Sequence, residues 1–319
     1  MSQQGIKNVF GSASVQKDRG FSSPDVLEQV YKTLEQGDVD TIDTATIYGA
    51  SQEFLGNTKA AERFIIDTKA PGGIVQGTAT KEGLVKTAEE SKKLLKTNQV
   101  DIWYLHGPDK SIPLEDTLAG VNEVYKSGFF KRFGLSNFFA EDVQKIYDIS
   151  KEKGYVLPSV YQGNYSAVAR KQEEVLFPTL RKLGIAFYAY SPIAGGFLVK
   201  TKEQIAEGKG RWDTSTPIGR MYAGLYAKPS YLEALAKWDA IAKEEGVTKA
   251  DLAYRWVKYN SPLKRENGDA IIIGASSVEQ LKETLGSIGK GPLSDKAAKA
   301  IDEIWEGIKH EAGLDNING

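Results

Sequence analysis

Four side chains with complementary acid–base chemistry lie at or just after short apolar stretches of the sequence. Asp43 and Tyr48 come at the end of one such stretch, five residues apart. Lys69 ends a second stretch, and His106 follows a third. A carboxylate, a phenol, an amine and an imidazole are the groups that proton transfer and charge stabilisation require. If the fold brings them together, they form a site for acid–base chemistry.

Reduction of a carbonyl group is the reaction that this set of side chains fits best. A carbonyl that accepts hydride becomes an alkoxide and needs a proton at once, and a free tyrosine, with a pKa of about 10, is a poor donor near neutral pH. The ammonium of Lys69 would lower the pKa of Tyr48 by favouring the phenolate, and Asp43 would keep Lys69 charged. His106 would hydrogen-bond the carbonyl oxygen and orient it.

These four residues are expected at one end of a barrel of parallel strands. Short apolar stretches alternate with amphipathic ones, and several are apolar throughout, as strands buried on both faces are. Eight strands, each followed by a helix, predict an α/β fold of the (β/α)8 TIM-barrel type, with catalytic residues at the carboxyl ends of the strands. The predicted strands are Val9–Gly11, Thr41–Asp43, Phe64–Asp67, Val100–Leu105, Phe133–Leu135, Ser159–Gln162, Ala186–Tyr190 and Ala270–Ile273.

Helices complete this architecture within a single domain of residues 1–319. Two elements go beyond the repeating pattern: a long loop from Pro192 to about Pro229 after the seventh strand, and an extra C-terminal helix at about Ser294–His310. An open doubly wound sheet is disfavoured, because the first strand runs into Phe10-Gly-Ser-Ala-Ser14 rather than G-x-G-x-x-G. Apolar residues at helical spacing predict helices at Gly83–Leu95, Leu114–Tyr125 and Asp142–Ser150.

Composition excludes several classes of protein and site. Lys and Arg total 41 against 42 Asp and Glu, so the net charge of −1 leaves no basic excess for nucleic acid or an anionic membrane. There is no Cys and only two His, which excludes disulfides, thiolate chemistry and a Cys- or His-rich metal site. The opening stretch Met1–Asn8 has no apolar signal core. We therefore expect a cytoplasmic protein that acts on a small molecule without a bound metal.

The motifs around these residues resemble the aldo-keto reductase superfamily, in order, along essentially the whole chain. Within it, the chain most resembles the aflatoxin-aldehyde reductase branch and its fungal relatives, through Ser191-Pro-Ile-Ala-Gly-Gly-Phe-Leu198 and Ser276-Ser-Val-Glu-Gln-Leu281. The other matching pieces are Asp43-x4-Tyr48-Gly49, Thr68-Lys69, Leu105-His106-Gly107, Gly134-Leu-Ser-Asn137, Gln162-x-Asn164, Tyr190-Ser-Pro192 and Ile273-Gly-Ala-Ser276.

By this resemblance, Tyr48 is the acid of a catalytic tetrad with Asp43, Lys69 and His106. The implied reaction is the NADPH-dependent reduction of aldehydes or ketones, with NADH the less expected cofactor. Two other functions stay open. Lys69 could form a Schiff base in a barrel lyase, although Asp43 beside it argues for a charged lysine. The chain could also be a non-catalytic cofactor sensor, and a homodimer stays open as its assembly.

The resemblance also implies where the cofactor binds. Ser136, Asn137 and Gln162 match residues that hold the nicotinamide carboxamide, and Tyr190 matches the ring that stacks on the nicotinamide. Ser277–Gln280 has the pattern of a capping box that opens a helix, and a helix N-terminus attracts phosphate. The glycine-rich long loop is expected to be mobile without cofactor and to order over the cofactor's phosphates. The remaining implied cofactor residues are Ser191, Ile193, Gly195, Leu198, Gly274, Ser276, Gln280 and Thr284.

Two positions depart from the family pattern. Relatives that reduce succinic semialdehyde carry an arginine in the long loop for the substrate carboxylate, and the alignment puts Leu225 there, with Arg220 nearby. At the adenosine phosphate, where many members place Arg or Lys, Lys282 is the only nearby cation, and Arg211 is expected to help. An apolar, aromatic wall would suit uncharged substrates. The residues predicted to line the substrate pocket are His106, Trp212, Tyr222, Leu225 and Tyr226.

Overall fold

Eight parallel strands close into a barrel at the centre of the computed structural model, which describes residues 5–16, 20–21 and 23–317. Each strand pairs with the next in chain order, and the eighth closes the ring on the first. The predicted (β/α)8 barrel is therefore confirmed. Of the N-terminal stretch Met1–Asn8, residues 1–4 lie outside the described residues. The strands are β1 (Lys7–Gly11), β2 (Thr41–Asp43), β3 (Ile65–Ala70), β4 (Val100–Leu105), β5 (Phe130–Ser136), β6 (Pro158–Asn164), β7 (Ala186–Tyr190) and β8 (Ala270–Gly274).

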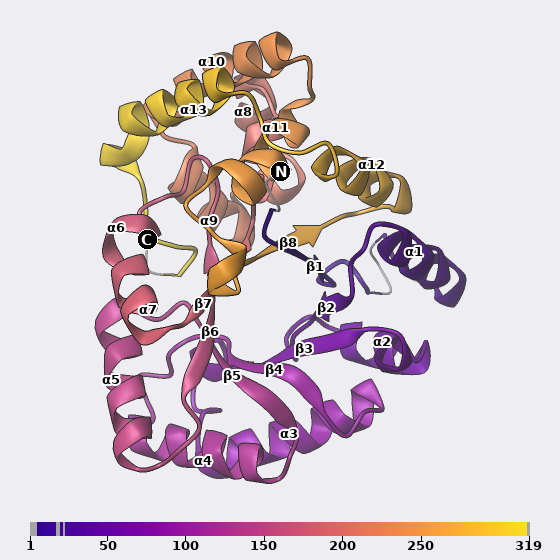
Figure 1. Cartoon of the computed structure of the whole chain (residues 1–319), viewed down its shortest axis with the longest axis vertical. Coiled ribbons are helices and arrows are strands. Elements are labelled where there is room, and N and C mark those ends of the chain that lie inside the picture. Colours follow the sequence, from indigo (N-terminus) through magenta and orange to yellow (C-terminus); the bar gives the residue numbers. More distant parts are fainter. Residues whose placement is uncertain (1–4, 17–19, 22, 318–319) are drawn as a thin grey trace.

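Helices form the outer layer around the barrel (Figure 1). The three helices predicted from apolar spacing are present as α3, α4 and α5. Each buries one apolar face against the strands, because apolar residues three or four apart share a side of a helix. The helices of this layer are α1 (Pro24–Gln36), α2 (Ser51–Asn57), α3 (Lys81–Leu95), α4 (Leu114–Lys126), α5 (Ala140–Glu152), α6 (Gln172–Val175), α7 (Phe177–Leu183), α10 (Pro229–Glu245), α11 (Lys249–Arg255) and α12 (Val278–Ile288).

Two apolar cores hold the barrel and its helices together. The larger lies between the strands and the helices, and the smaller fills the barrel interior. The ring of Tyr104 occupies the space beside Gly134, where an added Cβ would lie 2.2 Å from Cδ1 of the ring. Gly134 is therefore required for the interior to accept Tyr104. The apolar interior residues are Val9, Ile102, Tyr104, Val160, Ala186, Tyr188, Ala270 and Ile272.

Four strands extend further toward the barrel mouth than predicted, one of them, β8, by the single residue Gly274. β3 runs to Ala70 rather than Asp67, so Lys69 lies within the strand. β5 ends at Ser136 and β6 at Asn164, each beyond its predicted end. The prediction ended each strand where apolar residues gave way to polar ones. Backbone pairing continues past that point because the inward polar side chains meet one another in the barrel mouth.

The segment between β7 and α10, predicted as a long loop, folds into short helices. Aromatic packing explains the difference: the ring centroid of Phe197 lies 6.0 Å from that of Trp212 and 5.6 Å from that of Tyr226. All three rings are buried, so the segment has a small core of its own. Its elements are η3 (Ala194–Val199), α8 (Lys202–Ala206), η4 (Gly210–Trp212) and α9 (Pro217–Tyr226).

The extra C-terminal helix is confirmed as α13 (Asp295–Ile308), which lies alongside α10 (Figure 1). Ile301, Ile304 and Trp305 are on its buried face. None of the helices in the described ranges is both long and apolar enough to cross a membrane. Shorter helical turns complete the chain at η1 (Ala60–Glu62), η2 (Gly72–Ile74), η5 (Trp256–Asn260), η6 (Arg265–Asn267) and η7 (Lys309–Glu311).

Candidate active site

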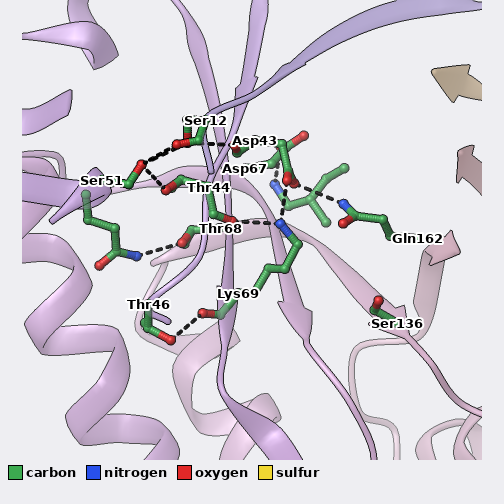
Figure 2. A network of polar contacts seen from close by, with 12 residues as sticks. Ser12, Asp43, Thr44, Thr46, Ser51, Asp67, Thr68, Lys69, Ser136 and Gln162 are labelled. Carbon is green, nitrogen blue, oxygen red and sulfur yellow. Dashed lines mark hydrogen bonds and ion pairs between the residues drawn. The ribbon is translucent and has the colours of Figure 1, made fainter. Parts of the chain in front are cut away.

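Asp43 and Lys69 form a buried ion pair at the mouth of the barrel. The Nζ atom of Lys69 lies 2.5 Å from Oδ1 of Asp43 and also donates to the carbonyl of Thr44 at 2.8 Å. The side chain of Lys69 is 0% exposed and that of Asp43 is 3% exposed, so water screens neither charge. Figure 2 shows the pair at the centre of a polar network. Each buried charge depends on the other, because an unpaired charge in this position is strongly destabilising.

Lys69 is held as an ammonium. Burial alone would lower its pKa, but the carboxylate of Asp43 and the phenol of Tyr48 outweigh burial and hold the pKa above its ordinary value. This agrees with the expectation that Asp43 keeps the lysine charged. A Schiff base requires the neutral amine, so this arrangement disfavours lyase chemistry at Lys69.

Tyr48 lies against the ammonium from the loop that follows β2. The Nζ atom of Lys69 is 5.2 Å from the centroid of the Tyr48 ring, and this ring lies edge-on to His106 with centroids 5.8 Å apart. Burial raises the pKa of Tyr48, the ammonium lowers it, and the net pKa is above the ordinary value. The expectation of a lowered pKa is therefore wrong for this structure, because burial outweighs the ammonium.

His106 comes directly after β4, and its amide donates to the carbonyl of Ala70 at 3.1 Å. Burial, followed by the charge of Lys69, lowers the pKa of the imidazole to about 3, so the ring is neutral at physiological pH. Its Nδ1 atom has no hydrogen-bond partner among the described residues. A neutral imidazole carries one N–H, which can donate to a carbonyl oxygen without losing its proton.

Small hydroxyl residues hold the backbone behind the ion pair. Oγ of Ser12 donates to the carbonyl of Asp43 at 2.9 Å. Oγ of Ser51 lies 2.9 Å from the hydroxyl oxygens of both Ser12 and Thr44 (Figure 2). Sequence reasoning missed these supporting residues, because serine and threonine are common in turns and carry no distinctive signal there.

The residues assigned to the nicotinamide end lie together at the mouth and connect to the ion pair. Nδ2 of Asn137 donates to Oγ of Ser136 at 3.0 Å, and the hydroxyl of Tyr190 donates to Oδ1 of Asn137 at 3.0 Å. Nε2 of Gln162 donates to Oδ2 of Asp43 at 3.0 Å, as Figure 2 shows. β5, β6 and β7 thus each contribute a polar or aromatic group beside the tetrad residues.

The backbone of the mouth is strained at several positions. Asn137, Ser191 and Ala194 have φ angles of 63°, 58° and 51°, in the left-handed region that costs a non-glycine residue roughly 1–3 kcal/mol. Gly195 has φ of 65°, and a Cβ there would lie 2.1 Å from Cε1 of Tyr222. Strain of this kind clusters where backbone is placed to bind a ligand. The other cofactor residues predicted on this turn are Ile193, at its start, and Leu198, which is buried in η3.

The Aldo/keto reductase family model matches residues 9–306 of the chain. The chain belongs to the aldo-keto reductase family. It is 40% identical to Oxidoreductase sirO of Leptosphaeria maculans over 308 residues, which are 95% of this chain and 93% of that protein. It is 38% identical to Aldo-keto reductase family 7 member A3 and 37% identical to Aflatoxin B1 aldehyde reductase member 4, both of Homo sapiens, over 232 and 230 residues, with 68% of each chain covered. The resemblance to the aflatoxin-aldehyde reductases and their fungal relatives is confirmed.

In this aldo-keto reductase, the residues assigned to the adenosine phosphate lie at the start of α12. The hydroxyl of Ser277 accepts from the amide of Gln280 at 3.2 Å, which is one half of the predicted capping box. The other half is wrong. Oε1 of Gln280 accepts from the amide and the hydroxyl of Ser276, at 2.7 and 2.8 Å, rather than from Ser277. Ser276 is exposed, whereas Thr284 is buried on α12.

Arg211 of the reductase is an exposed cation close to the end of β8. Its guanidinium lies 5.7 Å from the centroid of the Tyr222 ring, and no described carboxylate forms an ion pair with it. Burial raises the pKa of Tyr254, and the charge of Arg211 opposes this rise. The charge of Arg211 therefore lies near Tyr254. The hydroxyl of Tyr254 donates to the carbonyl of Gly274 at 3.2 Å, and Gly274 is the last residue of β8. Arg211 thus lies near the edge of the barrel where the α12 residues follow β8.

Besides His106, which follows β4, four residues were predicted to line the substrate pocket of the reductase, and they lie in η4 and α9. Trp212 and Tyr226 are 2% exposed and pack mainly within the aromatic core of their segment. Tyr222 lies close enough to Tyr48 to contribute to the raised pKa of that phenol. Leu225 is also buried. Of the four, Tyr222 is therefore the residue that the structure brings next to the tetrad.

Proposed function

We propose that this chain reduces aldehydes or ketones to alcohols with NADPH, using Tyr48 as the proton donor. Membership of the aldo-keto reductase family implies carbonyl reduction. The observation that carries the finer proposal is the buried ion pair of Lys69 and Asp43 beside Tyr48. An ammonium next to a phenol favours the phenolate, which is the form that Tyr48 takes once it has given up its proton.

Each tetrad residue has one task in this proposal. NADPH, when bound, supplies a hydride to the carbonyl carbon. His106 donates its single ring N–H to the carbonyl oxygen and orients it. Tyr48 delivers a proton to the same oxygen, while Lys69 stabilises the phenolate and Asp43 holds Lys69 in place. Because the pKa of Tyr48 is raised, the phenol keeps its proton until negative charge develops on the substrate oxygen.

The side chains around the mouth fit a dinucleotide with a phosphate at its far end. At the nicotinamide end, Asn137 and Gln162 offer amide groups and Tyr190 offers a ring. At the far end, the exposed Ser276 and the amides that open α12 offer hydrogen-bond donors to a phosphate. The unpaired charge of Arg211 lies near this end, which is the reason to propose NADPH over NADH.

Uncharged carbonyl compounds are the proposed substrate class. Leu225 stands where relatives that reduce succinic semialdehyde have an arginine. Arg220 does not replace that charge, since its Nη1 atom donates to two carbonyls of its own segment at 3.1 and 2.9 Å. A substrate carboxylate would lack a charged partner here, whereas Tyr222 offers aromatic surface to an apolar compound. The names of the aflatoxin B1 aldehyde reductases point to aldehydes as well.

A panel of carbonyl compounds, assayed with NADPH and with NADH, tests this proposal. We expect NADPH to be oxidised, with a kcat/KM about tenfold higher for a nitrobenzaldehyde than for succinic semialdehyde. Leu225→Arg should shift this ratio about tenfold toward the acid, because it restores a charge-assisted partner. Leu225→Met is the matched control and should leave the ratio unchanged.

The outcomes of this panel separate the substrate class from the function. A wild-type preference for succinic semialdehyde would contradict the substrate class alone. Cofactor binding without oxidation by any carbonyl compound would instead support the cofactor sensor that the sequence left open. Borohydride trapping of a substrate on Lys69 would support the lyase.

A further inference from the structure

Asp67 is a buried carboxyl group that the proposed reaction does not use. It lies on β3 two residues before Lys69, so both side chains face the barrel interior. Its side chain is fully buried, and Oδ1 accepts a hydrogen bond from the amide of Ile102 at 3.0 Å. Oδ2 has no partner among the described residues. Figure 2 shows Asp67 beside Asp43, which is its partner across the β2–β3 ladder.

On the side toward the barrel mouth, Asp67 faces the tetrad and one further phenol. Asp43 on β2 adds negative charge, and Lys69 on β3 adds positive charge that Asp43 already neutralises. Tyr104 on β4 is the other polar group on this side. Its hydroxyl is buried and, within the described part of the chain, has no hydrogen-bond partner. No side chain that the structure describes on this side gives an ionised Asp67 a cation of its own.

On the opposite side, the one nearby cation among the described residues is also paired. Arg132 on β5 lies 2.6 Å from a carboxylate oxygen of Asp101 on β4 and donates to the hydroxyl of Tyr188 on β7 at 3.3 Å. Apolar side chains of the barrel interior fill the remaining space. Burial, followed by the carboxylates of Asp43 and Asp101, raises the pKa of Asp67 to about 8. Asp67 is therefore a neutral acid near pH 7 and an anion at mildly alkaline pH.

We propose that Asp67 is a positioning residue that sets the strength of Tyr48 as a proton donor by acting through Lys69. While Asp67 is protonated, the ammonium acts fully on Tyr48. Once ionised, Asp67 adds a buried negative charge that offsets the ammonium and disfavours the phenolate. The proton still passes from Tyr48 to the substrate oxygen, and Asp67 neither gives nor takes it. This inference rests on the proposed function, since it concerns the proton donor of carbonyl reduction.

Single-turnover hydride transfer from NADPH to an aldehyde, followed against pH, tests this role. In Asp67→Asn the amide oxygen can still accept from the Ile102 amide, but the side chain cannot ionise. We expect the wild-type rate to fall about tenfold between about pH 6.5 and about pH 9.5, with a midpoint near pH 8. The Asp67→Asn rate, relative to its own value at the lower pH, should fall less than about twofold. Asp101→Asn removes a repelling carboxylate and should move the midpoint to lower pH.

Carbon-13 NMR of the aspartate carboxyl groups gives a readout that does not depend on turnover. One carboxyl should titrate with a midpoint near pH 8 in the wild-type protein and be missing from Asp67→Asn. The proposal is overturned if no such carboxyl is found, or if Asp67→Asn retains the wild-type pH profile. A protein that reduces no carbonyl compound at any pH overturns the proposed function, and this proposal with it, even where the NMR titration is observed.

Discussion

Lys69 is a charged side chain without exposed surface, and the carboxylate of Asp43 is the largest of the influences that keep it charged. Removing Asp43 would leave that ammonium buried without a counter-ion, at a cost of about 3–5 kcal/mol. The ion pair of Asp43 and Lys69 also affects which group can exchange a proton with the substrate. Because Asp43 stabilises the ammonium form of Lys69, the proposed reaction assigns the proton transfer to Tyr48.

Tyr48→Phe should lower kcat for carbonyl reduction about 10³-fold, because the hydroxyl acts in the transition state. NADPH affinity should change less than about twofold, since the phenylalanine ring fills the same space. Steady-state kinetics and a fluorescence titration with NADPH measure the two effects. Tyr125→Phe, which removes an exposed phenol on α4, is the matched control. A Tyr48→Phe protein that keeps more than about a tenth of wild-type kcat would show that the proton donor has been misassigned.

At the scale of elements, the segment between β7 and α10 divides into packed and unpacked parts. The aromatic rings of η3, η4 and α9 bury one another. Residues 200–210, all of them within the described chain, bury only Ile205. Gly208 and Gly210, with φ of 62° and 64°, flank Lys209 in this stretch. The part of the segment that is free to respond to a ligand is therefore shorter than the whole predicted loop.

Hydrogen exchange measured with and without NADPH should show this division. We expect exchange to slow about fivefold or more across residues 200–211 when NADPH binds, because its phosphates give the backbone and Arg211 a partner. Helix α9 should change little, since its aromatic residues are already packed, and α4 serves as the internal reference. Equal exchange of residues 200–211 in both states would mean that they form a fixed wall and take no part in cofactor binding.

At the scale of the whole molecule, two buried groups couple protonation to stability in opposite directions. His106 has a pKa of about 3 in the fold against an ordinary 6.5, so the stability it contributes is lost as pH falls below 6.5. Asp67 has a pKa of about 8 in the fold against an ordinary 3.8, so the stability it contributes is lost as pH rises from 3.8 to 8. Each group changes the free energy of unfolding by about 1.4 kcal/mol per pH unit within its range.

Urea unfolding at several pH values should separate the two groups. Relative to wild type, Asp67→Asn should gain about 2 kcal/mol between about pH 6.5 and about pH 8, because the wild-type carboxyl is ionised in the unfolded chain and must take up a proton on folding, whereas the amide need not. His106→Gln should gain stability relative to wild type as pH falls below 6.5, since it has no imidazole to protonate. His310→Gln, at an exposed position, should follow the wild-type curve. Parallel wild-type and Asp67→Asn curves between about pH 6.5 and about pH 8 would contradict the prediction, because they would show that Asp67 is already ionised in the fold over this range.

The barrel, the order of its strands and the position of three of the four residues at its mouth could be predicted from the amino-acid sequence. Alternation of apolar strands and amphipathic helices is a local pattern, and parallel strands all present their carboxyl ends at one edge. Asp43, Lys69 and His106 could therefore be placed together without coordinates. The departure from the family pattern at Leu225 also came from the sequence, and it stays a prediction.

The electrostatics and the packing depend on contacts between residues far apart in the sequence, so they could not be predicted from local patterns. The bond from Gln162 to Asp43 joins residues 119 positions apart, and no local pattern predicts it. The raised pKa of Tyr48 depends on how burial weighs against the ammonium, which is set by surroundings drawn from several strands. The helices of the predicted loop form because rings distant in sequence meet. Asp67 looked like an ordinary strand-end residue until the closed barrel showed that its carboxyl group is fully buried, with the described cations near it paired with Asp43 and Asp101.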